Sequence, residues 1–119
     1  MRVVFVGAGH NLAYLYQVMM SELSTGYRVL GYFEDKDSKH LPDTITRLGT
    51  VSDLVAWLEK NPVDQVYCNL PSSRSHEIVQ TINYCESHLI RFFSVPNVRN
   101  YVHRQMVVRM MADMPVLTI

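Results

Sequence analysis

The sequence predicts an α/β fold on a mainly parallel sheet, because short apolar runs alternate with stretches of helical periodicity. Residues 3–6 form a continuous apolar run, which is typical of a parallel strand buried on both faces. The run ends at Gly7-Ala8-Gly9, directly before a helical pattern. Strand, glycine turn and helix in this order predict a Rossmann-like three-layer sandwich, with helices on both faces of the sheet.

The first half of the chain supplies three predicted strands and two predicted helices. The first helix runs from His10 to about Leu23, because apolar residues recur at helical spacing and Thr25-Gly26 follows. The next elements, in chain order, are a strand at 28–33, a polar loop at 36–43, a short strand at 45–48 and a helix from Gly49-Thr50 to Asn61-Pro62. We expect Thr50 or Ser52 to cap this second helix.

The second half continues the alternation of strand and helix. A strand over 66–70 precedes Pro71-Ser72-Ser73 and a third helix, and residues 90–95 form a fifth strand. The residues predicted to face inward are Leu54, Val55 and Leu58 in the second helix, and Ile78, Val79, Ile82 and Cys85 in the third. We expect a C-terminal strand pair over 106–111 and 116–119, and a short helix over 98–106 is an alternative for the start of this region.

Size and composition limit the classes of function. We expect residues 1–119 to form a single domain, which is too short for a cofactor domain joined to a substrate domain. Acidic and basic residues balance at 11 each, which argues against nucleic acid as a partner. Cys68 and Cys85 match neither a metal motif nor a disulfide framework, so we expect two buried thiols in a reducing compartment. No run approaches the about 18 apolar residues of a membrane span, so we expect the chain itself to be soluble.

The glycine turn is predicted to face a phosphate-bearing ligand, because parallel sheets bind ligands beyond the carboxyl ends of their strands. Gly7 permits a tight turn, Gly9 lets the backbone approach a pyrophosphate, and His10 and Asn11 lie at the helix N-terminus, which favours anions. Leu12 replaces the third glycine of the G-x-G-x-x-G fingerprint, so the motif indicates phosphate more strongly than NAD. In the alternative, the glycines only turn the chain and His10 bonds backbone or water.

Two further segments are expected at the same edge of the sheet. Glu34 and Asp35 end the second strand, where a carboxylate accepts hydrogen bonds from ribose hydroxyls and repels a 2′-phosphate. The alternative is a solvated acidic turn. After the fourth strand, Pro71 and Ser72 together with Arg74 are predicted to line the far side of the cleft. An alternative of equal weight is that the serines of this segment only cap the helix and that Arg74 lies in solvent.

The chain lacks motifs for catalysis. Its five histidines show no zinc-ligand spacing, and no nucleophile elbow, P-loop or Y-x-x-x-K pattern is present. We therefore predict no catalytic and no metal-ligating residue. The sequence does not distinguish NAD, a nucleotide sugar and CoA as the ligand.

An ordered set of short motifs resembles one protein family. After the opening run and glycine turn come G-Y-R-V-L-G-Y-F-E-D from Gly26 to Asp35, L-G-T from Leu48, V-D-Q-V-Y from Val63, L-P at Leu70 and M-P-V-L from Met114. In order and spacing they resemble the soluble nucleotide-binding-like, or CoA-binding-like, domain of bacterial polyprenyl glycosylphosphotransferases. These are the transferases that initiate capsular and exopolysaccharide synthesis. The similarity spans essentially all of the chain.

The resemblance implies a place in a larger membrane protein. In that family the domain lies at the cytoplasmic face of the inner membrane, between membrane helices and a C-terminal catalytic domain. The catalytic domain uses magnesium to move a sugar 1-phosphate from a UDP-sugar to undecaprenyl phosphate. The resemblance therefore implies an accessory domain excised from its parent, with the rest of the parent as its partner. It carries over Gly7, Gly9 and Asp35 as positions of a nucleotide or CoA cleft.

Two other functions compete with this interpretation. One is the NAD(P)-binding domain of a nucleotide-sugar dehydratase or epimerase, and the other is a stand-alone sensor of NAD or CoA. A homo-oligomer is also expected if Met106, Val108, Met110 and Met114 make an exposed apolar stripe. In the alternative, these side chains cover the sheet edge or a helix.

Overall fold

The computed structural model describes residues 1–21, 26–96, 108–111 and 114–118, the last two as backbone. Its strands and α-helices, in chain order, are β1 (Arg2–Val6), α1 (His10–Ser21), β2 (Arg28–Phe33), β3 (Arg47–Gly49), α2 (Leu54–Lys60), β4 (Gln65–Cys68), α3 (Ser75–Ser87), β5 (Arg91–Ser94), β6 (Val108–Met111) and β7 (Met114–Thr118). Two short 3₁₀ helices, η2 (Val51–Asp53) and η3 (Ser72–Arg74), lead into α2 and α3. Predicted and observed elements therefore agree in type and order.

The strands form one sheet in the order β3-β2-β1-β4-β5-β7-β6. The pairs among the first five are parallel, whereas β7 is antiparallel to both β5 and β6. From β1 the chain adds β2 and β3 on one side and β4 and β5 on the other, so the strand order reverses beside β1. The predicted Rossmann-like sandwich with a C-terminal strand pair is confirmed.

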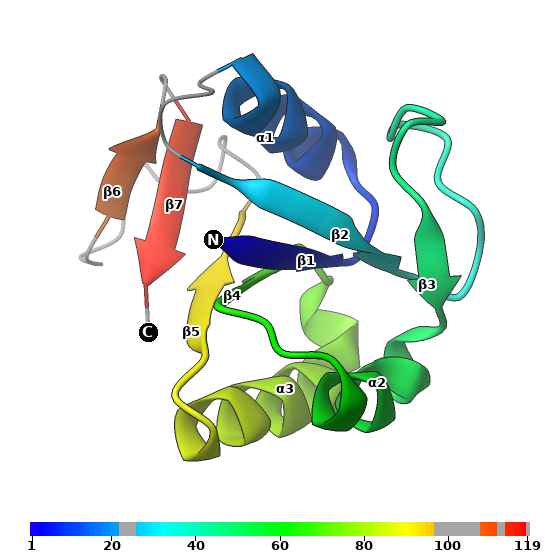
Figure 1. Cartoon of the computed structure of the whole chain (residues 1–119), viewed down its shortest axis with the longest axis vertical. Helices are drawn as coiled ribbons and strands as arrows, with labels where there is room; N and C mark the ends of the chain where they lie inside the picture. The colour runs from blue at the N-terminus through cyan, green and yellow to red at the C-terminus, as the bar shows by residue number, and fades with distance from the viewer. Residues whose placement is uncertain (22–25, 97–107, 112–113, 119) are drawn as a thin grey trace.

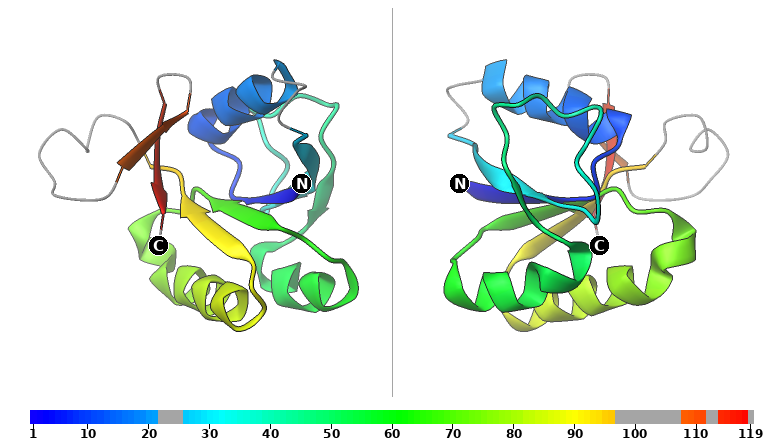
Figure 2. Two further views of the ribbon diagram at one scale, coloured as in Figure 1. Left: turned by 60° about the vertical axis from the view of Figure 1, so that its left-hand side comes forward. Right: turned by 90° about the vertical axis from the view of Figure 1, so that its right-hand side faces the viewer.

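Helices cover both faces of the sheet, as Figures 1 and 2 show. α1 lies on one face, and α2 and α3 lie side by side on the other. The side chains of β1 alternate between these layers, because Val3 and Phe5 belong to the α1 cluster and Val4 and Val6 to the α2–α3 cluster. All four are 0% exposed. The 34–46 connection adds to the α1 cluster, which includes its Leu41 and Ile45.

The observed elements differ from the predicted ones in three places. The third strand begins at Arg47 rather than at residue 45, because Ile45 lies in the loop and packs into the core. In α3, Val79 is 52% exposed, and Thr81 takes a buried place on the inner face instead. Thr81 Oγ1 donates to the Glu77 carbonyl, which satisfies the buried hydroxyl. In α2, Val55 is half-buried.

The C-terminal strands are shorter or shifted relative to the prediction. β6 begins at Val108 and β7 at Met114, and Thr118 lies opposite Phe93 of β5. The alternative helix over 98–106 and the side chains of the proposed apolar stripe lie outside the described part of the chain. Self-association through that stripe stays a prediction. None of the helices in the described residues has both the length and the hydropathy of a membrane span.

Candidate functional site

An open pocket of about 520 Å³ lies at the carboxyl ends of β1, β2 and β4. It is lined by Ala8, Gly9, Glu34, Asp35, Lys36, Asp37, Ser38, Lys39, His40, Asn69 and Arg74. The three segments expected from the sequence therefore meet at one place. This is the edge where the strand order reverses and where open α/β sheets bind their ligands.

The glycine turn packs directly against Asn69. Gly7 has φ +94° and its N–H donates to the Phe33 carbonyl at 2.8 Å. A Cβ atom at Gly7 would collide with the backbone carbonyl oxygen of Asn69, and one at Gly9 would collide with the Asn69 side-chain oxygen. Packing therefore requires a glycine at position 7, where backbone is in the way, and disfavours a side chain at position 9 while the Asn69 amide keeps its place. This requirement is compatible with the predicted ligand contact, because Gly9 also lines the pocket.

Asn69 is itself fixed between the strands. Its N–H donates to the Val6 carbonyl at 2.8 Å, and its side-chain amide donates to the Val95 carbonyl. Asn11 makes a similar contact, because its amide donates to the Pro96 carbonyl. The side-chain amide of Asn11 is thus directed toward the end of β5, and Asn11 does not line the pocket.

The start of α1 suits an anion. The Gly9 carbonyl accepts the bond from Ala13 N–H at 3.3 Å, and the first turn contains no acidic residue. His10 is exposed, and its ring contacts that of His40 edge to face, with centroids 5.9 Å apart. His10 does not line the pocket, although His40 does. The positive end of the helix dipole therefore lies beside the glycine turn, and no acidic residue within the first turn of α1 neutralises it.

The acidic pair at the end of β2 is bound to an arginine from across the cleft. Arg74 Nη1 lies 2.9 Å from Glu34 Oε1, and Arg74 Nη2 lies 2.9 Å from Asp35 Oδ2. A third carboxylate, Glu77 of α3, lies 2.8 Å from Arg74 Nε. These contacts, led by the Glu77 hydrogen bonds, raise the pKa of the Arg74 guanidinium above its ordinary value. Arg74 therefore lies in the cleft, which is one of the two placements expected from the sequence. Glu34 and Asp35 are both ion-paired with it, so they do not form a turn whose carboxylates contact solvent alone.

Pro71 and Ser72 do not join the pocket. Both are exposed, and the Pro71 carbonyl accepts from Arg74 N–H at 2.9 Å at the start of η3. Their place in the structure is the turn that carries Arg74 to the cleft. They contribute through the backbone rather than as lining side chains.

The loop after β2 supplies a wall of the pocket that the sequence did not indicate. Ser38 Oγ donates to the Ala8 carbonyl at 3.0 Å and accepts from the N–H groups of His40 and Leu41. Tyr32 Oη accepts from Ser38 N–H at 3.0 Å. Ser38 thereby joins this loop to the glycine turn. A serine in a polar loop carries no specific signal, because only the fold brings Ala8 beside it.

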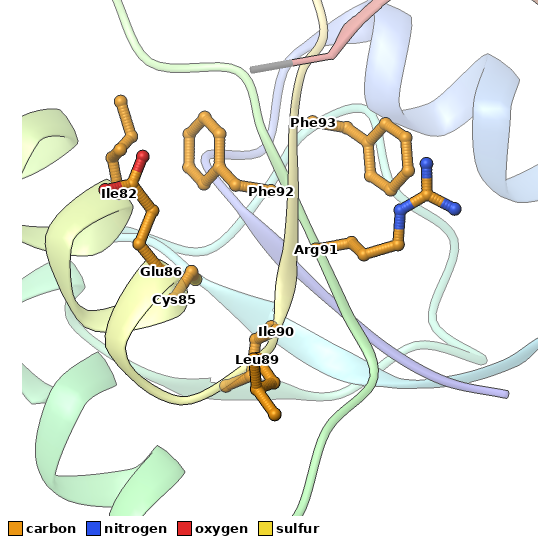
Figure 3. Close-up of a pocket in the computed structure, with 8 residues that line it drawn as sticks. All are labelled: Ile82, Cys85, Glu86, Leu89, Ile90, Arg91, Phe92 and Phe93. Carbon is orange, nitrogen blue, oxygen red and sulfur yellow. The ribbon is translucent and has the colours of Figure 1, made fainter.

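A second pocket of about 310 Å³ lies between the end of α3 and β5 (Figure 3). In that view Phe92 points toward α3, whereas Phe93 and Arg91 lie on the opposite side of the strand. No residue of the predicted site lines it. In the described part of the chain, no group of three or more metal-ligating side chains is arranged to hold a metal ion.

Fold and site together define a Rossmann-like, nucleotide-binding-like domain. The chain belongs to the CoA-binding domain family, whose model matches residues 1–96. Among solved structures it is similar to UDP-D-quinovosamine 4-dehydrogenase from Vibrio fischeri, with 13% identity and a TM-score of 0.47. That similarity covers 85% of this chain and 82% of the other. No curated protein matches the chain.

Proposed function

We propose that the cleft binds the diphosphate of a small nucleotide-containing ligand, with NAD, a nucleotide sugar and CoA as the candidates. The diphosphate lies against Ala8 and Gly9 at the start of α1, and the ribose lies toward Glu34 and Asp35, whereas Gly7 is buried and only shapes the turn. The observation that carries this proposal is the meeting of three chain segments around one open pocket at the switch point of the sheet. Membership of the CoA-binding domain family supports the same class of ligand.

Calorimetric titration of the 119-residue chain tests the proposal. NAD, UDP-glucose, CoA and inorganic pyrophosphate serve as probes, and we expect heat of binding from pyrophosphate and from at least one nucleotide. His10→Asp adds a negative charge at the exposed start of α1. The new carboxylate interacts favourably with the positive end of the helix dipole but repels a diphosphate. We expect it to weaken binding about tenfold, which corresponds to ~1.4 kcal/mol.

Gln17→Asp is the matched control, because residue 17 is exposed on the same helix two turns from the glycine turn. We expect this variant to bind as the unmodified chain does. If none of the probes binds at millimolar concentration, the cleft is no nucleotide site and the proposal fails.

The parent of this domain, in our proposal, is a membrane sugar-1-phosphate transferase that initiates capsular or exopolysaccharide synthesis on undecaprenyl phosphate. The ordered motifs, from the run at Gly26 to Asp35 through M-P-V-L at Met114, support this assignment. The domain then acts as an accessory domain at the cytoplasmic face of the inner membrane. Its partner is the rest of the parent, which carries the catalytic residues.

Expression of the complete reading frame tests the parent's identity. We expect the product to sediment with inner membranes and to transfer labelled sugar 1-phosphate from a UDP-sugar to undecaprenyl phosphate. Two results would overturn the assignment. One is a complete protein without membrane helices, and the other is conversion of the UDP-sugar to a keto-sugar, which would make the parent a dehydratase.

A further inference from the structure

The pocket of about 310 Å³ beside α3 is a groove along one edge of β5. Its lining comes from both faces of the sheet (Figure 3), because Ile82, Cys85 and Phe92 lie on the side of α3, and Arg91 and Phe93 lie on the opposite side of the strand. A pocket that is lined from both faces opens at the edge of the strand. Since β4 pairs with one edge of β5 along its whole length, the groove lies on the edge that faces β7.

The backbone of β5 directs hydrogen-bonding groups toward this groove. The N–H groups of Arg91 and Val95 donate to carbonyls in and beside β4, at 3.1 and 2.7 Å. Successive residues of a strand direct their N–H and C=O groups to opposite edges, so those of Phe92 are directed away from β4. The edge of β5 at Phe92 therefore presents the donor and the acceptor that an added strand requires.

β7 runs toward this part of β5. Its described pairs with β5 end with Thr118 opposite Phe93, and the pairing is antiparallel. A chain that keeps this pairing moves back along β5 by one residue for each residue that it adds. The next three positions after Thr118 then lie opposite Phe92, Arg91 and Ile90, and all three of these residues line the groove.

The two faces of β5 set different requirements for such a strand. Phe92 and Ile90 pack in the apolar cluster beneath α2 and α3, whereas Arg91 lies on the other side of the strand (Figure 3). Side chains that lie directly opposite each other in an antiparallel pair share a face of the sheet. The first and third positions after Thr118 therefore suit apolar residues, and the second suits an acidic residue that pairs with Arg91.

Leu89 lies at the far end of the groove in a costly conformation. Its φ is +57° and its side chain is 94% exposed. A Cβ atom is strained in this conformation, and an exposed leucine gains little from burial to offset the strain. A strand added along β5 passes Ile90 and then covers this leucine.

We propose that the chain that follows β7, from Ile119 on, continues antiparallel along β5 and docks in this groove. This inference rests on the proposed membrane parent, because the docked segment is the start of the linker toward the rest of that protein. Ile119 supplies the apolar residue at the first position. Docking fixes the point from which the linker leaves the domain, so the rest of the parent is joined to a defined edge of this sheet.

Hydrogen exchange of the Phe92 amide, measured by NMR, tests the docking. The 119-residue chain is compared with the same chain extended by the next ~6 residues of the parent's reading frame, one ordinary strand length. We expect the extension to slow exchange of Phe92 N–H about tenfold, because a chain end frays whereas an extended strand holds this hydrogen bond. The Arg91 amide, which is bonded on the β4 side, is the internal reference and should change by less.

Leu89→Asn tests the contact at the end of the groove. Asparagine is tolerated in the left-handed conformation, so the substitution removes the apolar side chain without adding strain or charge. In the extended chain, we expect it to reduce the slowing at Phe92 from about tenfold to about threefold. Val79→Asn is the matched control, because Val79 is 52% exposed on α3 and does not line the groove. This control should keep the full slowing.

The outcomes separate the docking from the proposed function. Equal exchange of Phe92 N–H in the short and extended chains overturns the docking and leaves nucleotide binding and the parent standing. Slowing that appears only as the chain dimerises, followed by analytical ultracentrifugation, assigns the groove to a second copy and overturns the inference as well. A reading frame that stops after Ile119 overturns the parent and this inference together.

Discussion

At the scale of single residues, Asn69 determines what the turn after β1 tolerates. Its backbone carbonyl excludes a side chain at Gly7, and its side-chain oxygen excludes one at Gly9. From the sequence, Gly7 was interpreted as permitting a tight turn and Gly9 as letting the backbone approach a pyrophosphate, with the alternative that both only turn the chain. The packing reason was hidden, because Asn69 lies about 60 residues away and only strand pairing brings β4 beside β1.

The two glycines should respond differently to truncation of Asn69. We expect Gly9→Ala to destabilise the fold by ~1–3 kcal/mol, and to cost much less in an Asn69→Ala background, where the clashing side-chain oxygen is gone. Gly7→Ala should cost the same in both backgrounds, because it meets a backbone carbonyl and requires a positive φ. Urea unfolding of the unmodified chain, of Asn69→Ala and of the four glycine variants measures this, and equal costs of Gly9→Ala in both backgrounds would contradict it.

Leu89 adopts a conformation better suited to glycine. It follows α3 with φ +57°, and its side chain is 94% exposed. Helices commonly end on a glycine in this left-handed conformation, because a Cβ atom is strained there. We expect Leu89→Gly to raise the free energy of unfolding by ~0.5–1 kcal/mol, measured by urea denaturation. A loss of stability would mean that Leu89 makes a contact the fold requires.

At the scale of elements, helices and strands were predictable where periodicity is strong, and their exact faces and ends were not. Val79 was expected inside, but α3 turns Thr81 inward, because the Glu77 carbonyl satisfies its hydroxyl. Ile45 has strand-forming character but fills the core from a loop. Such outcomes depend on tertiary packing, which local propensity does not encode.

The loop between β2 and β3 depends on Ser38. Its hydroxyl makes one bond as donor, to the Ala8 carbonyl, and two as acceptor, from His40 and Leu41 N–H. We expect Ser38→Ala to destabilise the fold by ~1–3 kcal/mol and to weaken ligand binding, because the loop wall loses its tie to the glycine turn. Ser87→Ala, at the exposed end of α3, is the control and should change the stability and the ligand affinity by less. Unfolding and calorimetry measure the two effects.

At the scale of the whole molecule, the parallel topology made the place of the site predictable. Alternating strands and helices indicated that the ends of β1, β2 and β4 would meet, and they do. The network around Arg74 was not predictable, because its partner Glu34 lies 40 residues away. The sequence allowed Arg74 a place in the cleft or in solvent, and only the assembled sheet distinguishes the two.

The two cysteines link stability to pH. Cys68 and Cys85 are free and buried, and burial raises the pKa of Cys68 to about 11 and that of Cys85 to about 12, from 9.0. Above pH 9 the unfolded chain loses these protons while the folded chain keeps them, so stability falls as pH rises. We expect the urea midpoint to drop between pH 9 and 11, and less so in a double Cys→Ala variant. A midpoint constant over this range in the unmodified chain would contradict the prediction.

The contact between Asn69 and the two glycines affects how the G-x-G pattern is used in motif searches. In a chain that keeps an asparagine at this place, the pattern persists for steric reasons even after a domain has stopped binding nucleotides. A search that scores the glycines would then report a binding site wherever the fold survives. The positions that distinguish a binding domain from one that keeps only the fold are Glu34, Asp35 and Arg74. The pairing of β1 with β4 does not require their arrangement.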